Sequence, residues 1–127
     1  MNESYGIQSM YDYFQLKGKT AIVTGAGNGI GKGIAEMLAS LGVNVVACDI
    51  EGDSVENTAK EVAEKGGIIR AVHCDVSNMD DVDRSIQTAL DVFGGLDILV
   101  NNAAGCGGGV KVGNMTDQEG GRLINLN

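Results

Sequence analysis

Four short apolar segments alternate with three amphipathic segments, and this order constrains the fold more than any other feature of the chain. Each apolar segment is five to seven residues long and is rich in aliphatic side chains. Near-continuous apolar strands that alternate with helices are typical of βαβ units, in which a parallel sheet is covered on both faces. We therefore predict a doubly wound α/β fold with strands at residues 20–24, 43–48, 68–74 and 96–100.

The segments between these strands carry apolar residues at intervals of three and four, which places them on one face of a helix. A glycine or a pair of glycines follows each segment, where the end of a helix is expected. We expect Asp53 or Ser54 to cap the second helix, and Ser77, with Asp80 three residues later, to cap the third. The residues expected on the buried faces are Ile30, Ile34, Leu38 and Leu41, then Val55, Ala59 and Val62, then Val82, Ile86, Ala89, Leu90 and Phe93.

Glycines cluster between the first strand and the first helix, where residues 24–31 read Thr-Gly-Ala-Gly-Asn-Gly-Ile-Gly. The N-terminus of a helix exposes unsatisfied N–H groups and a partial positive charge, so it attracts anions. Glycines here permit a tight turn and let a pyrophosphate approach the backbone. Because the loop follows a strand and opens a helix, it predicts a dinucleotide site rather than a simple turn. The residues expected at the cofactor are Gly25, Asn28, Gly29, Ile30 and Gly31.

Asp49 closes the second predicted strand and follows the glycine loop at the distance expected of a ribose-binding acid. A carboxylate at this place can accept hydrogen bonds from the adenosine ribose and repels a 2′-phosphate. Position 28 is Asn and position 50 is Ile, so neither neighbour offsets the negative charge. We predict NAD(H) rather than NADP(H) as the cofactor, with Ile50 also in the cofactor site. The alternative interpretation is that Asp49 is an ordinary loop acid.

Composition excludes several classes of function. Nine Lys plus Arg stand against 17 Asp plus Glu, a net charge of −8, so the clustered cations that nucleic-acid binding requires are not expected. No apolar run reaches the length of a membrane span, and the N-terminus does not resemble a secretory signal. Cys48, Cys74 and Cys106 lack the spacing of a zinc site, and His73 has no partner pair. We expect a cytoplasmic protein with no metal site, no membrane association and no nucleic-acid partner.

These motifs together resemble those of the classical short-chain dehydrogenase/reductase family. Residues 24–31 match the family's TGxxxGxG pattern, and residues 101–103, Asn-Asn-Ala, are similar to its NNAG motif, although the glycine comes one place late. The resemblance covers residues 17–127. It implies a Rossmann-type NAD-binding domain with strand order 3-2-1-4, preceded by an N-terminal extension at residues 1–16.

The resemblance also implies roles for residues that follow the third and fourth strands. Asp75 and Val76 are expected at the adenine ring, and Asn102 and Ala103 at the other ribose. One member of the family's catalytic tetrad is an asparagine. The tail of the chain favours Asn127 for this role.

Matching the tail in a second register would assign the tetrad asparagine to Asn125 instead. The family's catalytic serine, tyrosine and lysine follow this asparagine, beyond the last residue of the chain. The tyrosine needs nearby positive charge, because a phenol of pKa about 10 is a poor acid or base at neutral pH. The resemblance implies hydride transfer between NAD(H) and a secondary alcohol or ketone, in a dimer or tetramer.

Two interpretations of the chain remain open at this point. In the first, it is the amino-terminal half of a longer dehydrogenase whose later strands extend the sheet. In the second, it is a catalytically incomplete dinucleotide-binding half-domain that acts as a binding or assembly module. An apolar strand at residues 96–100 on the edge of a four-stranded sheet favours pairing with more chain or with a partner.

Overall fold

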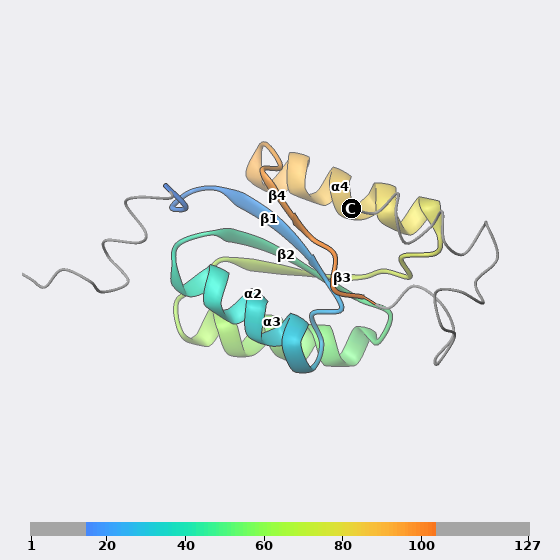
Figure 1. Ribbon diagram of the computed structural model, residues 1–127, viewed down its shortest axis with the longest axis horizontal. Coiled ribbons are helices and arrows are strands. Elements are labelled where there is room, and N and C mark those ends of the chain that lie inside the picture. The colour runs from blue at the N-terminus through green and yellow to red at the C-terminus, as the bar shows by residue number, and fades with distance from the viewer. Residues whose placement is uncertain (1–14, 104–127) are drawn as a thin grey trace, which may run out of the picture.

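A computed structural model describes residues 15–103, which form a four-stranded parallel sheet with helices on both faces (Figure 1). The strand order is β3-β2-β1-β4 and every strand pair is parallel, which confirms the predicted doubly wound α/β fold. Helices α2 and α3 cover one face, and α4 covers the other. In chain order the elements are β1 (Thr20–Thr24), α2 (Gly29–Ser40), β2 (Asn44–Asp49), α3 (Gly52–Glu64), β3 (Ile69–His73), α4 (Met79–Phe93) and β4 (Ile98–Val100).

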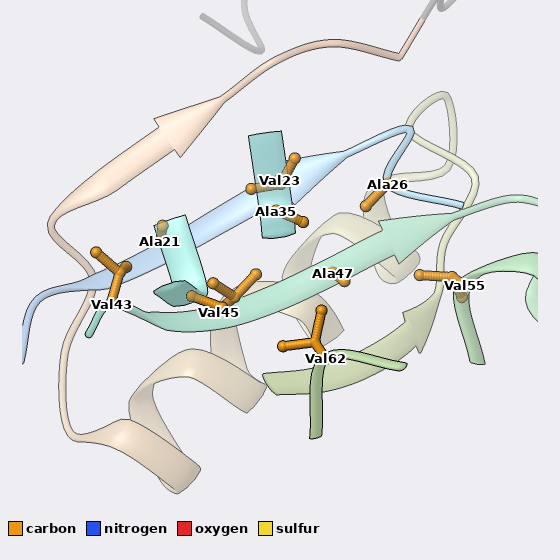
Figure 2. Packing of buried hydrophobic residues seen from close by; sticks show 10 residues of the cluster. Ala21, Val23, Ala26, Ala35, Val43, Val45, Ala47, Val55 and Val62 are labelled. Atoms are coloured by element: carbon orange, nitrogen blue, oxygen red, sulfur yellow. The ribbon is translucent and has the colours of Figure 1, made fainter. Parts of the chain in front are cut away.

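The two central strands supply most of the core, and their side chains alternate between the two faces as the pleat of a strand requires. Ala21, Val23 and Val45 point toward α2 and α3, where small aliphatic residues pack together (Figure 2). Ile22 and Val46 point the other way, toward α4. Every residue of β1 is buried, because this strand has a neighbour on each side and helices above and below.

The buried face of α2 is shifted by one position along the helix from the predicted face. Gly31, Ala35 and Ala39 are the buried residues of this helix, whereas Ile30 is 76% exposed. Where α2 comes closest to the sheet its side chains are small, so the helix packs tightly on β1 and β2. The larger Ile34 and Leu38 lie beside this contact and are only partly buried. The hydrophobic period correctly indicated a helix, but the side-chain sizes determined which of its residues face the sheet.

The other two helices show the same kind of difference. In α3, Val55 and Val62 are buried as predicted, but the buried residue between them is Thr58 rather than Ala59. In α4, Ala89 is buried as predicted and Ser85 is buried as well, but two residues of the predicted face are substantially exposed. Those two are Ile86, 37% exposed, and Leu90, 46% exposed.

The helix ends confirm the predicted stops and correct the predicted starts. Gly42, Gly66 and Gly94, which follow α2, α3 and α4, all have positive φ. Helix α3 begins earlier than predicted, with Glu51 as its N-cap residue in place of Asp53 or Ser54. Helix α4 is capped by Asn78, whose side-chain oxygen accepts from the N–H groups of Asp80 and Asp81, rather than by Ser77. The Ser77 hydroxyl donates instead to Asp75.

Candidate functional site

The predicted cofactor residues within the described range lie where the four parallel strands end, at one edge of the sheet (Figure 1). The connection after β1 runs to β2 on one side, while β4 lies on the other side of β1. Such a reversal of strand order opens a crevice beyond the carboxyl ends of the strands, and α/β proteins bind ligands there. The fold therefore places the glycine loop, the end of β2 and the segment after β4 around one point.

Two glycines of the loop make close contacts that no other residue allows. A Cβ on Gly31 would lie 2.1 Å from the carbonyl oxygen of Gly25 and 2.6 Å from Nδ2 of Asn102. Gly25 has φ of +66°, and a Cβ there would lie 2.9 Å from the same Asn102 nitrogen. These glycines let the start of α2, the end of β1 and the segment after β4 meet. Gly29 also has positive φ, but a Cβ there would point into open space.

The N-terminus of α2 remains available to an anion. Its N-cap residue, Asn28, makes no capping hydrogen bond, and no acidic side chain lies in the first turn. Helix α4 is the opposite case, since Asn78 caps its N–H groups and two aspartates occupy its first turn. Uncapped N–H groups and a helix dipole favour a phosphate group at α2, so this helix end fits the pyrophosphate of a dinucleotide.

Asp49 is held in place by backbone N–H groups on both sides. Its Oδ2 accepts from the N–H of Gly27 at 2.8 Å, and its Oδ1 accepts from the N–H of Glu51 at 3.0 Å. A Cβ on Gly27 would lie 2.8 Å from Asp49 Oδ2, so this third loop glycine is required for the contact. Each carboxylate oxygen keeps a further lone pair, which can accept from a ribose hydroxyl.

Thr24 joins the segment after β4 to the glycine loop. Its hydroxyl oxygen accepts from the N–H groups of Asn102 and Ala103, each at 3.0 Å. The Asn102 side chain in turn reaches the Gly25 carbonyl oxygen at 3.5 Å. Asn102 and Ala103 are thus fixed against the loop, on the opposite side of the β1 end from Asp49. This is the arrangement expected if they and Asp49 contact different parts of one extended ligand.

The remaining predicted residues line the same edge. Asp75 follows β3, and its Oδ1 accepts from the backbone N–H and the hydroxyl of Ser77. Val76 packs partly buried in the apolar cluster under α4. Ile30 and Ile50 are exposed, at 76% and 59%, so two apolar side chains face solvent beside the glycine loop and the end of β2.

Two structural supports of the site were not predicted from the sequence. Thr58, fully buried on α3, donates from its hydroxyl to the carbonyl oxygen of Ala26 at 3.0 Å and so ties the glycine loop to the helix. Glu51 connects the loop to α3 through its side chain. A signal for Thr58 existed, because a polar residue stands between Val55 and Val62 at helical spacing, in the middle of an apolar face.

A cavity of about 140 Å³ lies on the α4 face of the sheet, lined by apolar residues of β1, α4 and β4 and by two thiols. The Cys48 thiol donates to the Ser85 hydroxyl at 3.3 Å. A hydrogen bond between Cys48 and Cys74 lowers the pKa of the Cys74 thiol against the effect of burial. The same hydrogen bond, together with burial, raises the pKa of Cys48. Both cysteines are reduced. Thr24, at the start of the glycine loop, and Val76 also line this cavity.

The strand order and the helices on both faces of the sheet together define a Rossmann-type α/β domain. The model of the short chain dehydrogenase family matches residues 19–127. The chain therefore belongs to the short-chain dehydrogenase family, as its motifs predicted.

Three comparisons illustrate the relationship. The chain is 40% identical over 116 residues to 7alpha-hydroxysteroid dehydrogenase of Escherichia coli K12, covering 91% of this chain and 45% of the relative. It is 42% identical over 109 residues to a diacetyl reductase, (S)-acetoin forming, of Staphylococcus epidermidis, covering 86% and 42%. A solved structure of 7 alpha-hydroxysteroid dehydrogenase with NADH and 7-oxo glycochenodeoxycholic acid superposes with a TM-score of 0.73 at 40% identity, covering 88% and 43%. The chain spans less than half the length of these relatives.

Some predicted residues lie outside residues 15–103. These are Asn125 and Asn127, the two choices for the tetrad asparagine, and most of the predicted N-terminal extension. Within the described range, no group of three or more His, Cys, Asp or Glu could hold a metal ion. No helix in that range is long and apolar enough to cross a membrane.

Proposed function

We propose that this chain carries the cofactor-binding part of an NAD-dependent oxidoreductase that transfers a hydride between NAD(H) and a secondary alcohol or ketone. The observation that carries the proposal is the uncapped N-terminus of α2 beside the fixed carboxylate of Asp49. One feature suits a pyrophosphate and the other suits a ribose diol. Their arrangement at the carboxyl edge of a parallel sheet fits one dinucleotide that spans both.

The proposed contacts combine the geometry of this edge with the residue roles that the family resemblance implies. The N–H groups at the start of α2 bind the pyrophosphate, with Gly29 leaving open space where a side chain would otherwise stand. Asp49 accepts from the adenosine ribose, Asp75 and Val76 lie at the adenine, and Asn102 and Ala103 contact the other ribose. When bound, NAD(H) supplies or accepts the hydride.

We infer a preference for NAD(H) from the negative charge at the end of β2. A 2′-phosphate at the adenosine ribose would lie against the Asp49 carboxylate and be repelled. Support comes from the solved relative, whose structure contains NADH. The relatives named above act, by their names, on a hydroxysteroid and on diacetyl or acetoin, so we propose a small hydroxyl- or carbonyl-bearing substrate.

Catalysis itself requires groups outside the described residues. We propose that Asn127 supports proton transfer and that a serine, a tyrosine and a lysine further along the full-length protein complete the machinery. We also propose a homo-oligomer in the cytoplasm.

The test is a fluorescence titration of the full-length protein with NADH and with NADPH, followed by a turnover assay with secondary alcohols. We expect tighter binding of NADH and reduction of NAD⁺. Replacing Asp49→Ala together with Ile50→Arg should reverse the preference toward NADPH. An unchanged preference in that variant would contradict the role of Asp49. Binding without turnover would instead favour the binding-module interpretation.

A further inference from the structure

A second carboxylate lies beside Asp49, at the point where the glycine loop meets α3. Glu51 follows Asp49 by two residues, and its backbone N–H donates to Asp49 Oδ1. Its own carboxylate turns toward the loop, where Oε1 accepts from Asn28 Nδ2 at 3.4 Å and from the Ser54 hydroxyl at 3.2 Å. An exposed glutamate that joins two other elements in this way has a defined position.

Gly27 shows how closely these groups converge. A Cβ on Gly27 would lie 2.8 Å from Asp49 Oδ2 and also 2.8 Å from Cβ of Ser54. The Ser54 side chain that binds Glu51 therefore stands next to the Asp49 carboxylate. Two negative charges, from Asp49 and Glu51, face the same small region at the end of β2.

Among the described residues, the ion pairs found involve neither Asp49 nor Glu51. Lys32 of α2 binds Glu61 of α3 at 2.9 Å, and Arg84 of α4 binds Asp81 at 3.0 Å. A third acid, Asp53, lies in the first turn of α3. The positive N-terminus of α3 partly balances Glu51 and Asp53, but no side-chain cation in these contacts neutralises the two carboxylates around Gly27.

We propose that Glu51 is a second determinant of cofactor specificity, acting by charge together with Asp49 to exclude a 2′-phosphorylated dinucleotide. This inference rests on the proposed function and deepens it. Asp49 distinguishes the cofactors by hydrogen bonding to the ribose and by charge. Glu51 adds charge repulsion alone, directed at the phosphate that NADP(H) carries and NAD(H) lacks. At a separation of several ångströms in partly aqueous surroundings, one such charge changes affinity by about three- to tenfold.

The decisive variant is Glu51→Gln in the full-length protein. Gln removes the charge but retains a side-chain oxygen that can accept from Asn28 and Ser54. The matched control is Asp53→Asn, which removes the same charge two residues further on, outside the contacts around Gly27. The measurement is the ratio of the dissociation constants of NADPH and NADH, from fluorescence titrations at about 0.1 M and 0.5 M NaCl.

We expect Glu51→Gln to lower this ratio about three- to tenfold at the lower salt concentration, and Asp53→Asn to lower it by less than about twofold. The difference between the two variants should shrink at the higher salt concentration because mobile ions screen exposed charges. An unchanged ratio in Glu51→Gln, or an equal change in Asp53→Asn, overturns the inference. Equal weakening of both cofactors overturns it too, because that result indicates a purely structural role for Glu51.

The same titrations separate this inference from the proposed function. If the wild-type protein binds neither dinucleotide, the proposed function is wrong and the role of Glu51 is wrong with it. If the wild-type protein binds NADH and the ratio does not respond to Glu51→Gln, only the role of Glu51 is wrong.

Discussion

The two faces of the sheet are built differently. The face under α2 and α3 is packed with alanine and valine (Figure 2), and two helices cover it (Figure 1). The face under α4 has one described helix, contains the cavity, and carries larger apolar residues that are partly exposed. Ile86 of α4 and Leu99 of β4 are 37% and 47% exposed.

The difference shows which face of the sheet is more closely packed among the described residues. The α2–α3 face contains the glycine loop and its supports, and a Cβ added at Gly25, Gly27 or Gly31 would meet neighbouring atoms at 2.9 Å or less. The α4 face presents an apolar surface of the kind that packs against further structure. The backbone is therefore closely packed where we propose that the pyrophosphate and adenosine ribose bind.

The largest effect is expected from Gly31→Ala on the closely packed face. The new Cβ would meet the Gly25 carbonyl oxygen at 2.1 Å, so the start of α2 must move away from β1. Overpacking of this kind costs about 3 kcal/mol, and the displaced loop should lose NADH binding. Urea unfolding and an NADH titration of the full-length protein measure the two effects.

Gly33→Ala is the matched control for Gly31→Ala. Gly33 lies half a turn further along α2, and nothing lies within 4 Å of an added Cβ. Alanine is favoured over glycine inside a helix by about 1 kcal/mol, so this variant should be as stable as the wild type or more stable. Similar destabilisation in both variants would show that the two positions are not packed differently.

A smaller effect is expected when one buried hydroxyl is removed from each face of the sheet. Thr58→Val removes the hydrogen bond to Ala26 and leaves a buried carbonyl oxygen unpaired, at a cost of about 2 kcal/mol. Ser85→Ala on α4 removes contacts with Asp81 and Cys48, at a cost of about 1 kcal/mol. Urea unfolding measures the stabilities. NADH titration should show weaker binding only in Thr58→Val, and equal loss of binding in both variants would contradict the role of Thr58 in fixing the loop.

The smallest effect concerns the exposed ion pairs, one on each face. Lys32 lowers the pKa of Glu61, first by its hydrogen bond and then by its charge. The pKa of Asp81 is lowered mainly by the backbone N–H of Asp75 and only secondarily by Arg84. In both cases the stabilisation is present above the ordinary carboxyl pKa and is lost as the pH falls through the lower, folded-state pKa.

Lys32→Met should therefore return the pKa of Glu61 close to its ordinary value, whereas Arg84→Met should leave most of the lowering at Asp81. Both variants should melt close to the wild-type temperature, because exposed ion pairs contribute little to stability. Carboxyl pKa values from NMR titrations provide the measurement. A full return of the Asp81 pKa in Arg84→Met would show that the backbone contact is not its main cause.

Much of the arrangement of the candidate site could be predicted from the sequence because it depends on residue type and order. The glycine loop between a strand and a helix predicted where α2 begins, and Asp49 is placed by the end of β2. The helical spacing of α3 could have indicated that Thr58 is buried, but the contacts of Thr58 and Glu51 with the loop could not be assigned in this way. Their roles depend on contacts with a loop more than 20 residues away in sequence, at Ala26 and Asn28.

The sequence by itself determined the order of the elements, the parallel sheet, the dinucleotide motif and the family. Those features follow from periodicity and from glycines whose backbone conformation no other residue adopts easily. Only the tertiary structure decided which residues of each helix are buried, as the exchange of Ile30 for Gly31 shows. The physical reason is that periodicity records which residues are apolar, whereas burial also depends on how closely two backbones can approach.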